Sequence, residues 1–139
     1  MGQRNFRLRL NSRYGEKDNA IESLQVEHFH DGEWVPFKLG VTTPGFLIFV
    51  YAIFTCQHLY LRANAAENGL ALDSASGAIE VTTSEAWQVE EIRVDFDCRL
   101  RSGEASDETI DYIISRMEAC PVSLNLRQDL TFKTSVTMR

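Results

Sequence analysis

The alternation of apolar and polar residues near the start of the chain predicts three β-strands. Over residues 4–10, phenylalanine and leucine alternate with arginine, which is the period-two pattern of a strand with one buried face. A polar turn over 12–19 separates this strand from apolar positions at 21–26. A turn at 30–33 then leads into a third apolar stretch at 34–37. The pattern predicts a three-strand meander.

The next segment predicts a long helix over residues 44–68. A Thr-Pro pair at 43–44 provides an N-cap followed by proline in the first turn, and an Asn-Gly pair at 68–69 provides the stop. At about 1.5 Å per residue this helix is roughly 37 Å long, close to the expected diameter of a compact chain of this size, also roughly 37 Å. We therefore expect it to cross the whole domain as a buried central helix.

The first half of this helix is apolar on every face, so a sheet on one side leaves part of it uncovered. A second subunit is the simplest cover, which predicts a homodimer. The uninterrupted apolar run, residues 46–54, is too short to cross a bilayer, which takes about 20 apolar residues. No membrane partner is expected.

The second half of the chain predicts more strands and a shorter helix. Strands are expected over 78–83 and 87–100, the latter with an irregularity near Glu91. Ser106 caps a second amphipathic helix that ends at a Cys-Pro pair. Alternation begins again at Val122 and continues over 130–138 as a last strand. Residues 1–139 thus form a single α+β domain with segregated helices and strands.

Charge and the N-terminal sequence narrow the classes of function. Twenty acidic and 14 basic residues give a net charge of −6, which argues against a nucleic-acid or anionic-membrane surface and favours small molecules or proteins as partners. The first residues lack the apolar core of a secretory signal. We expect a cytoplasmic protein without a cofactor.

The three cysteines are Cys56, Cys98 and Cys120. An odd count without C-x-x-C spacing makes a structural disulfide framework or a zinc knuckle improbable and leaves free or redox-active thiols. Cys98 lies on a predicted strand and is expected to be structural. Cys56 and Cys120 each have an alternative interpretation as small buried core residues.

Histidines near these positions offer little support for a metal site. His28 and His30 share a face of a predicted strand, and His58 follows Cys56 by two positions. Residues two apart on a helix do not share a face, and no complete ligand motif is present. The same geometry argues against His58 as a base for Cys56, which lies several turns from the positive end of the helix dipole.

Two segments together resemble the OsmC/Ohr family, the osmotically induced and organic hydroperoxide resistance proteins. The first runs from Phe54-Thr55-Cys56 to Asn68-Gly69-Leu70 and is similar to the family's central helix. The second, residues 117–123, is similar to its second cysteine motif, and the strand at 92–96 matches the one that precedes it. Cys56 and Cys120 lie 64 positions apart, close to the family's spacing.

The resemblance implies an OsmC-like fold and an intertwined homodimer with active sites at the subunit interface. It also implies a cysteine-based, stress-response peroxidase that acts on small organic hydroperoxides. Cys56 would attack the peroxide and become a sulfenic acid, and Cys120 would resolve it to a disulfide. An external thiol would then reduce that disulfide.

Active members of the family also use an arginine from an early loop and a glutamate near the start of the central helix. Arg13 is the best arginine candidate, although a solvated turn charge explains it equally well. The glutamate is missing, because residues 44–46 are Pro-Gly-Phe and no carboxylate occurs between 42 and 64. Three carboxylates of the predicted meander could replace it: Glu22, Glu27 and Glu33.

The missing glutamate supports an alternative function and leaves open whether the protein is an enzyme. In this alternative the chain is a catalytically weak or inactive OsmC-like dimer that binds a small apolar ligand or senses redox state. The aromatic side chains at 46–54 could line a pocket for such a ligand, although aromatic residues in a buried helix more often belong to the core.

Overall fold

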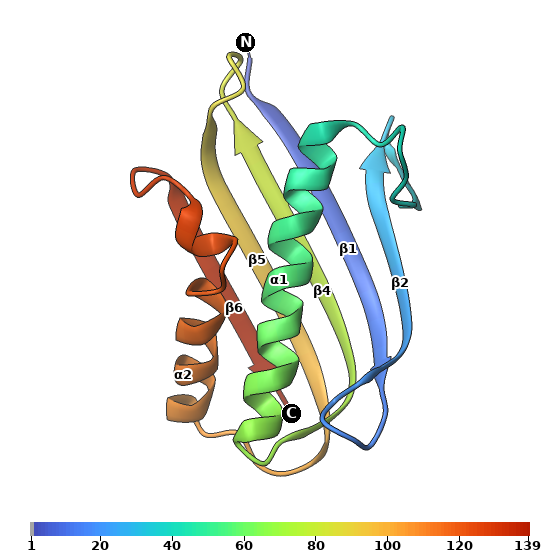
Figure 1. The fold of residues 1–139 in the computed structure, drawn as a ribbon, viewed down its shortest axis with the longest axis vertical. Helices are drawn as coiled ribbons and strands as arrows, with labels where there is room; N and C mark the ends of the chain where they lie inside the picture. Colours follow the sequence, from blue (N-terminus) through green and yellow to red (C-terminus); the bar gives the residue numbers. More distant parts are fainter. Residues whose placement is uncertain (1) are drawn as a thin grey trace.

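The computed structural model describes residues 2–139, which form one mixed six-stranded sheet with two helices on the same face (Figure 1). The strand order is β3-β2-β1-β4-β5-β6, with antiparallel neighbours except for the parallel pair β5 and β6. The predicted α+β class is confirmed. The elements are β1 (Arg4–Tyr14), β2 (Ile21–His30), β3 (Glu33–Pro36), α1 (Gly45–Glu67), β4 (Ala71–Thr83), β5 (Val89–Ser102), α2 (Asp107–Glu118), the 3₁₀ helix η1 (Ser123–Asn125) and β6 (Thr131–Met138).

The long helix α1 runs diagonally across the sheet, and α2 lies beside it over the β5 and β6 side (Figure 1). Strand residues alternate between this helix-covered face and a polar face on the other side, as the pleat requires. On β4, for example, Ile79 and Val81 are buried while Ala78 is exposed. The core therefore lies between the sheet and the two helices.

Both ends of α1 agree with the sequence prediction to within one residue. Its N-cap is Pro44, without a side-chain cap, because the Thr43 hydroxyl instead bonds the backbone of the preceding loop at Lys38 and Gly40. At the other end Gly69 has a φ of 75°, a conformation that glycine adopts without strain. This allows the Leu70 N–H to donate to the Ala65 carbonyl at 2.9 Å.

Among the described residues, α1 is the one helix long and apolar enough to cross a membrane by length and composition alone. A core helix of this length passes the same test. Several of its residues that face the sheet are buried polar side chains with partners inside the protein, including Gln57, His58 and Asn64. These contacts identify α1 as the core helix of the domain.

The structure corrects three predicted boundaries. Strand β1 continues to Tyr14, so Arg13 is a strand residue and not a loop residue. Strand β4 begins at Ala71, well before the predicted residue 78. Residues 123–125 form η1, so the last strand begins only at Thr131. At the end of β1 and the start of β4, polar or small residues obscured the strand pattern. At 122–126 the apolar alternation belongs instead to a local turn, in which the Leu124 N–H donates to the Cys120 carbonyl at 2.9 Å.

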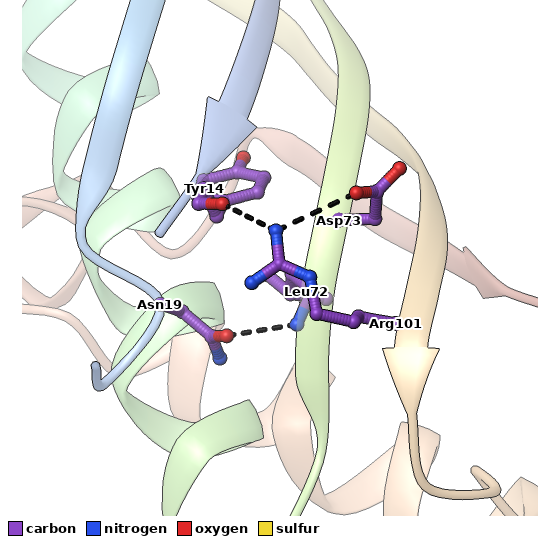
Figure 2. Close-up of polar contacts among 5 residues, drawn as sticks. All are labelled: Tyr14, Asn19, Leu72, Asp73 and Arg101. Atoms are coloured by element: carbon purple, nitrogen blue, oxygen red, sulfur yellow. Dashed lines mark hydrogen bonds and ion pairs between the residues drawn. The ribbon is translucent and has the colours of Figure 1, made fainter. Parts of the chain in front are cut away.

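Polar contacts at one end of the sheet hold the turn between β1 and β2 in place (Figure 2). Asn19 accepts the Leu72 N–H at 2.8 Å and also donates to the Leu70 carbonyl at 3.1 Å. The guanidinium of Arg101 donates to the Tyr14 carbonyl at 2.8 Å and lies 3.5 Å from Asp73. These contacts fix the end of β1 and therefore the position of Tyr14.

Substitution of Gly77 by alanine is expected to destabilise the fold. A Cβ at this position would lie 2.6 Å from the Phe96 ring on the adjacent strand. That ring cannot move freely, because the His58 imidazole stacks on it at 5.5 Å. Overpacking of this kind costs about 1–3 kcal/mol. Urea unfolding should show this loss of stability for Gly77→Ala. The control Ser76→Ala, at the exposed neighbouring position, should stay within about 0.5 kcal/mol of wild type. Equal stability of the two variants would contradict the account.

Candidate thiol redox site

The structure brings Cys56 and Cys120 together where α1 passes the turn that follows α2. Cys56 is partly exposed and Cys120 is fully buried. Both are free thiols, and the Cys120 side chain lies close enough to act on the ionisation of Cys56. The arrangement therefore pairs an accessible thiol with a second thiol from which solvent is excluded.

The surroundings of Cys56 disfavour its thiolate. Burial is the largest cause that raises the pKa of this thiol, and the neighbouring Cys120 raises it further, while the backbone N–H of Val122 lowers it. Within residues 2–139 no basic group is among these causes. The chain by itself thus holds Cys56 in its protonated form, whereas nucleophilic chemistry requires the thiolate.

Ser123 is the closest polar partner of Cys120. Its hydroxyl lies 3.0 Å from the Cys120 Sγ, and its backbone N–H donates to the same sulfur at 3.4 Å. The Gln57 amide, one position after Cys56, donates to the Ser123 Oγ at 3.4 Å and accepts from the Thr134 hydroxyl at 3.0 Å. This buried network joins α1, the cysteine turn and β6.

Arg13 is not brought to the cysteines within one chain. Its neighbours Ser12 and Tyr14 are buried on the α1 side of β1, whereas Arg13 is exposed. Since successive side chains of a strand point to opposite faces, the sheet lies between Arg13 and Cys56. The side chain instead lines an open hollow on the polar face, together with Asn11 and Arg99.

The carboxylates considered as substitutes for the missing glutamate lie on the outer strands β2 and β3. Glu27 is paired with Arg9 at 2.7 Å, and Glu22 and Glu33 are exposed. None of the three is among the groups that shift the pKa of Cys56. Within residues 2–139, the backbone N–H of Val122 is thus the one group that favours the Cys56 thiolate.

His58 faces the sheet and not the cysteines. Its Nε2 lies 2.6 Å from the Tyr14 hydroxyl, and its ring stacks on Phe96. Burial, and then the nearby Arg62 cation, lower the pKa of His58 to about 4. Burial also raises the pKa of Tyr14 to about 12. At neutral pH the contact therefore joins a protonated Tyr14 hydroxyl to a neutral imidazole.

The remaining candidate residues have structural positions. Burial raises the pKa of Cys98 to about 12, which makes this thiol inert. Phe54 is fully buried, and Phe46 packs against Phe6 and Trp87 as part of the core periphery. The rings of His28 and His30 stack at 5.7 Å, and among residues 2–139 no group of three or more His, Cys, Asp or Glu side chains is placed to hold a metal ion.

Sequence reasoning missed the roles of Gln57, Ser123 and Tyr14. A signal for the first was present, since Gln57 interrupts an otherwise apolar helix, and a buried amide needs hydrogen-bond partners. Ser123 lies within the cysteine motif but has no pattern of its own. The sequence pattern predicts a turn at Tyr14, and a turn residue gives no sign of the contact with His58 of α1.

The fold and the site define an α+β protein in which Cys56 on a long central helix lies beside Cys120 in the turn that follows α2. Residues 42–135 match the family model described as OsmC-like protein, and the chain belongs to this family. No curated protein matches this sequence.

Solved structures with the same fold include three from bacteria. An OsmC-like hydroperoxide resistance protein from Jannaschia sp. CCS1 is 13% identical, with a TM-score of 0.55; the match covers 87% of this chain and 85% of that protein. An OsmC-like protein from Mycoplasma pneumoniae is 12% identical, with a TM-score of 0.56; the match covers 92% of this chain and 94% of that protein. An OsmC-like protein of unknown function from Vibrio cholerae is 10% identical, with a TM-score of 0.53; the match covers 96% of this chain and 97% of that protein.

Protonation of His58 is expected to destabilise the protein in mild acid. Its pKa is about 4 in the fold against an ordinary value of 6.5, so between these values the unfolded chain binds a proton that the folded chain does not. The free energy of unfolding should therefore fall as the pH drops from 6.5 towards 4, by about 3 kcal/mol in total. Above pH 6.5 the residue should contribute no pH dependence.

The variant His58→Gln keeps a hydrogen-bonding side chain opposite Tyr14 but does not titrate, so its unfolding free energy should fall less between pH 7.5 and 5 than that of wild type. Urea unfolding at several pH values measures this difference. The exposed Gln25→Ala removes no titratable group and serves as control, so it should keep the wild-type slope. Identical slopes for wild type and His58→Gln would contradict the assignment.

Proposed function

We propose that this protein is a thiol-dependent peroxidase that reduces organic hydroperoxides through Cys56 and Cys120. The observation that carries the proposal is the pairing of a partly exposed Cys56 with a fully buried Cys120. The partial exposure of the first thiol supports a reaction with a substrate, and the burial of the second supports a reaction with its neighbour Cys56. Membership of the OsmC-like family supports the assignment.

The reaction has three balanced steps. Cys56 attacks the peroxide O–O bond of ROOH, which releases the alcohol ROH and leaves Cys56 as a sulfenic acid. The Cys120 sulfur then attacks the Cys56 sulfur, and the thiol proton and the sulfenic hydroxyl leave as water. Two electrons from an external dithiol or two thiols restore both cysteines. The Jannaschia protein with a similar fold is named a hydroperoxide resistance protein, which supports hydroperoxides as the substrate class.

The proposal includes a homodimer formed through α1. The side of this helix away from the sheet presents a stripe of small and apolar residues at the spacing of a helix–helix contact: Ile48, Ala52, Thr55, Leu59 and Ala63. Ile48 is 40% exposed and Leu59 is 49% exposed. An uncovered apolar stripe at this spacing favours a second helix as its cover, and a second copy of the chain provides one. Cys56 lies beside this stripe, so the dimer contact and the thiol site adjoin.

A second function is favoured by the raised pKa of Cys56 and the absence of a glutamate at the start of α1. In this alternative the dimer binds a small apolar ligand or forms the disulfide slowly as a redox sensor. It shares the fold and the cysteine pair with the first proposal and differs in the rate of reaction with peroxide. The cytoplasmic location expected from the sequence remains a prediction under either function.

Thiol counting after oxidation separates the two functions. Cumene hydroperoxide at stoichiometric amounts should convert Cys56 and Cys120 of the wild type to a disulfide within seconds. Cys120→Ser should stop at a sulfenic acid that dimedone traps, and Cys56→Ser should lose no thiol. Cys98→Ala is the control and should react as wild type does. Retention of all three thiols in the wild type would rule out the peroxidase.

The dimer is tested by a charge placed in the apolar stripe. The wild type should sediment at twice the 15.8 kDa chain mass, and Leu59→Glu should sediment as a monomer because burial of an unpaired carboxylate in the contact is unfavourable. Lys133→Glu, on the polar face of β6, is the matched control and should remain dimeric. A wild-type monomer at micromolar concentration would contradict the dimer.

A further inference from the structure

The buried network around Cys120 contains more polar groups than packing requires. Ser123 is 7% exposed and Gln57 is fully buried, and Gln57 lies on a helix whose neighbouring side chains are largely apolar. Burial of an amide is unfavourable unless its donors and acceptor are paired. An apolar residue would fill the same space without that cost, so the hydrogen bonds of Gln57 need an explanation.

The directions of the hydrogen bonds converge on the Cys120 sulfur. The Thr134 hydroxyl donates to the Gln57 Oε1 at 3.0 Å, which turns the Gln57 Nε2 towards Ser123. The Nε2 donates to the Ser123 Oγ at 3.4 Å and occupies a lone pair of that oxygen. The Ser123 Oγ lies 3.0 Å from the Cys120 Sγ, and when Cys120 is a thiolate its sulfur can only accept, so the Ser123 O–H is the donor.

A second donor reaches the same sulfur from the backbone. The Ser123 N–H donates to the Cys120 Sγ at 3.4 Å, while the preceding N–H, that of Val122, acts on Cys56. Two successive backbone N–H groups of this turn thus act on different sulfurs, that of Val122 on Cys56 and that of Ser123 on Cys120. Fixed donors aimed at a sulfur orient it and stabilise the negative charge that it carries during nucleophilic attack.

We propose that Ser123 is a catalytic residue of the step in which Cys120 attacks Cys56, and that Gln57 and Thr134 are the residues that position it. The inference rests on the proposed redox pair but not on the identity of the oxidant. With a sulfenic acid on Cys56, the Cys120–Cys56 bond forms and water leaves. With a mixed disulfide on Cys56, the same bond forms, and the attached thiol leaves as its anion while the Cys120 proton passes to buffer.

A peroxide-free reaction isolates this step. The reagent 5,5′-dithiobis(2-nitrobenzoate) modifies the accessible Cys56 and releases one nitrothiophenolate, because Cys98 and Cys120 are buried. Attack by Cys120 then releases a second nitrothiophenolate, and absorbance follows both phases. Cys120→Ala should show the first phase only. Failure of the wild type to react with hydroperoxide would refute the proposed peroxidase without affecting this measurement.

Removal of the converging donors should slow the second phase and leave the first unchanged. Ser123→Ala and Gln57→Met should each slow it about tenfold, the effect of losing one hydrogen bond to a charged group. Ser123→Thr keeps the hydroxyl and should recover most of the rate. Ser115→Ala is the matched control and should react as wild type does, because the exposed Ser115 hydroxyl donates to the Tyr112 carbonyl of α2.

The variant Gln57→Glu separates a chemical role from a purely structural one. Its ionised carboxylate accepts the Ser123 O–H and draws it away from Cys120, whereas the protonated acid donates to Ser123 as Gln57 does. The second-phase rate relative to wild type should therefore rise as the pH falls from 8 to 5. A pH-independent ratio, a wild-type rate in Ser123→Ala, or no second phase in the wild type would each overturn the proposal.

Discussion

The rest of the structure depends on how the apolar helix α1 is covered. The sheet buries one side of it through residues such as Ile53, Phe54 and Leu61, and α2 packs alongside. The remaining side still presents Ile48 and Leu59. One helix therefore forms the core of the domain, carries Cys56 and provides the surface proposed for the second subunit. These roles are linked, because a change in the cover of α1 also changes the surroundings of the thiol.

The polar residues buried along α1 position this helix more specifically than apolar packing alone. His58 bonds Tyr14 of β1, and Gln57 bonds both Ser123 and Thr134. Each contact fixes the rotation of α1 relative to a different part of the fold, since a register change would leave a buried polar group without a partner. The same contacts place His58 towards the sheet and leave Cys56 facing Cys120, so one turn of the helix presents two separate polar environments on different faces.

Local signals in the sequence were sufficient for most of the fold but not for the site. The Thr-Pro and Asn-Gly pairs located both ends of α1, because caps depend on residues within one turn. The end of β1 was missed because Tyr14 is held by His58 and by Arg101, which are distant in sequence. That error placed Arg13 in a loop, whereas it lies on a strand with its side chain on the polar face. Likewise, the parallel pairing of β6 and the Gln57 network arise from contacts between distant segments.

The central claim is that Cys56 and Cys120 form one redox pair, and disulfide mapping by mass spectrometry tests it most directly. After treatment with one equivalent of cumene hydroperoxide and digestion under acidic conditions, the account predicts a peptide that joins Cys56 to Cys120, with Cys98 unmodified. A sulfinic acid on Cys56 together with a free Cys120 thiol, or a disulfide that includes Cys98, would contradict the account.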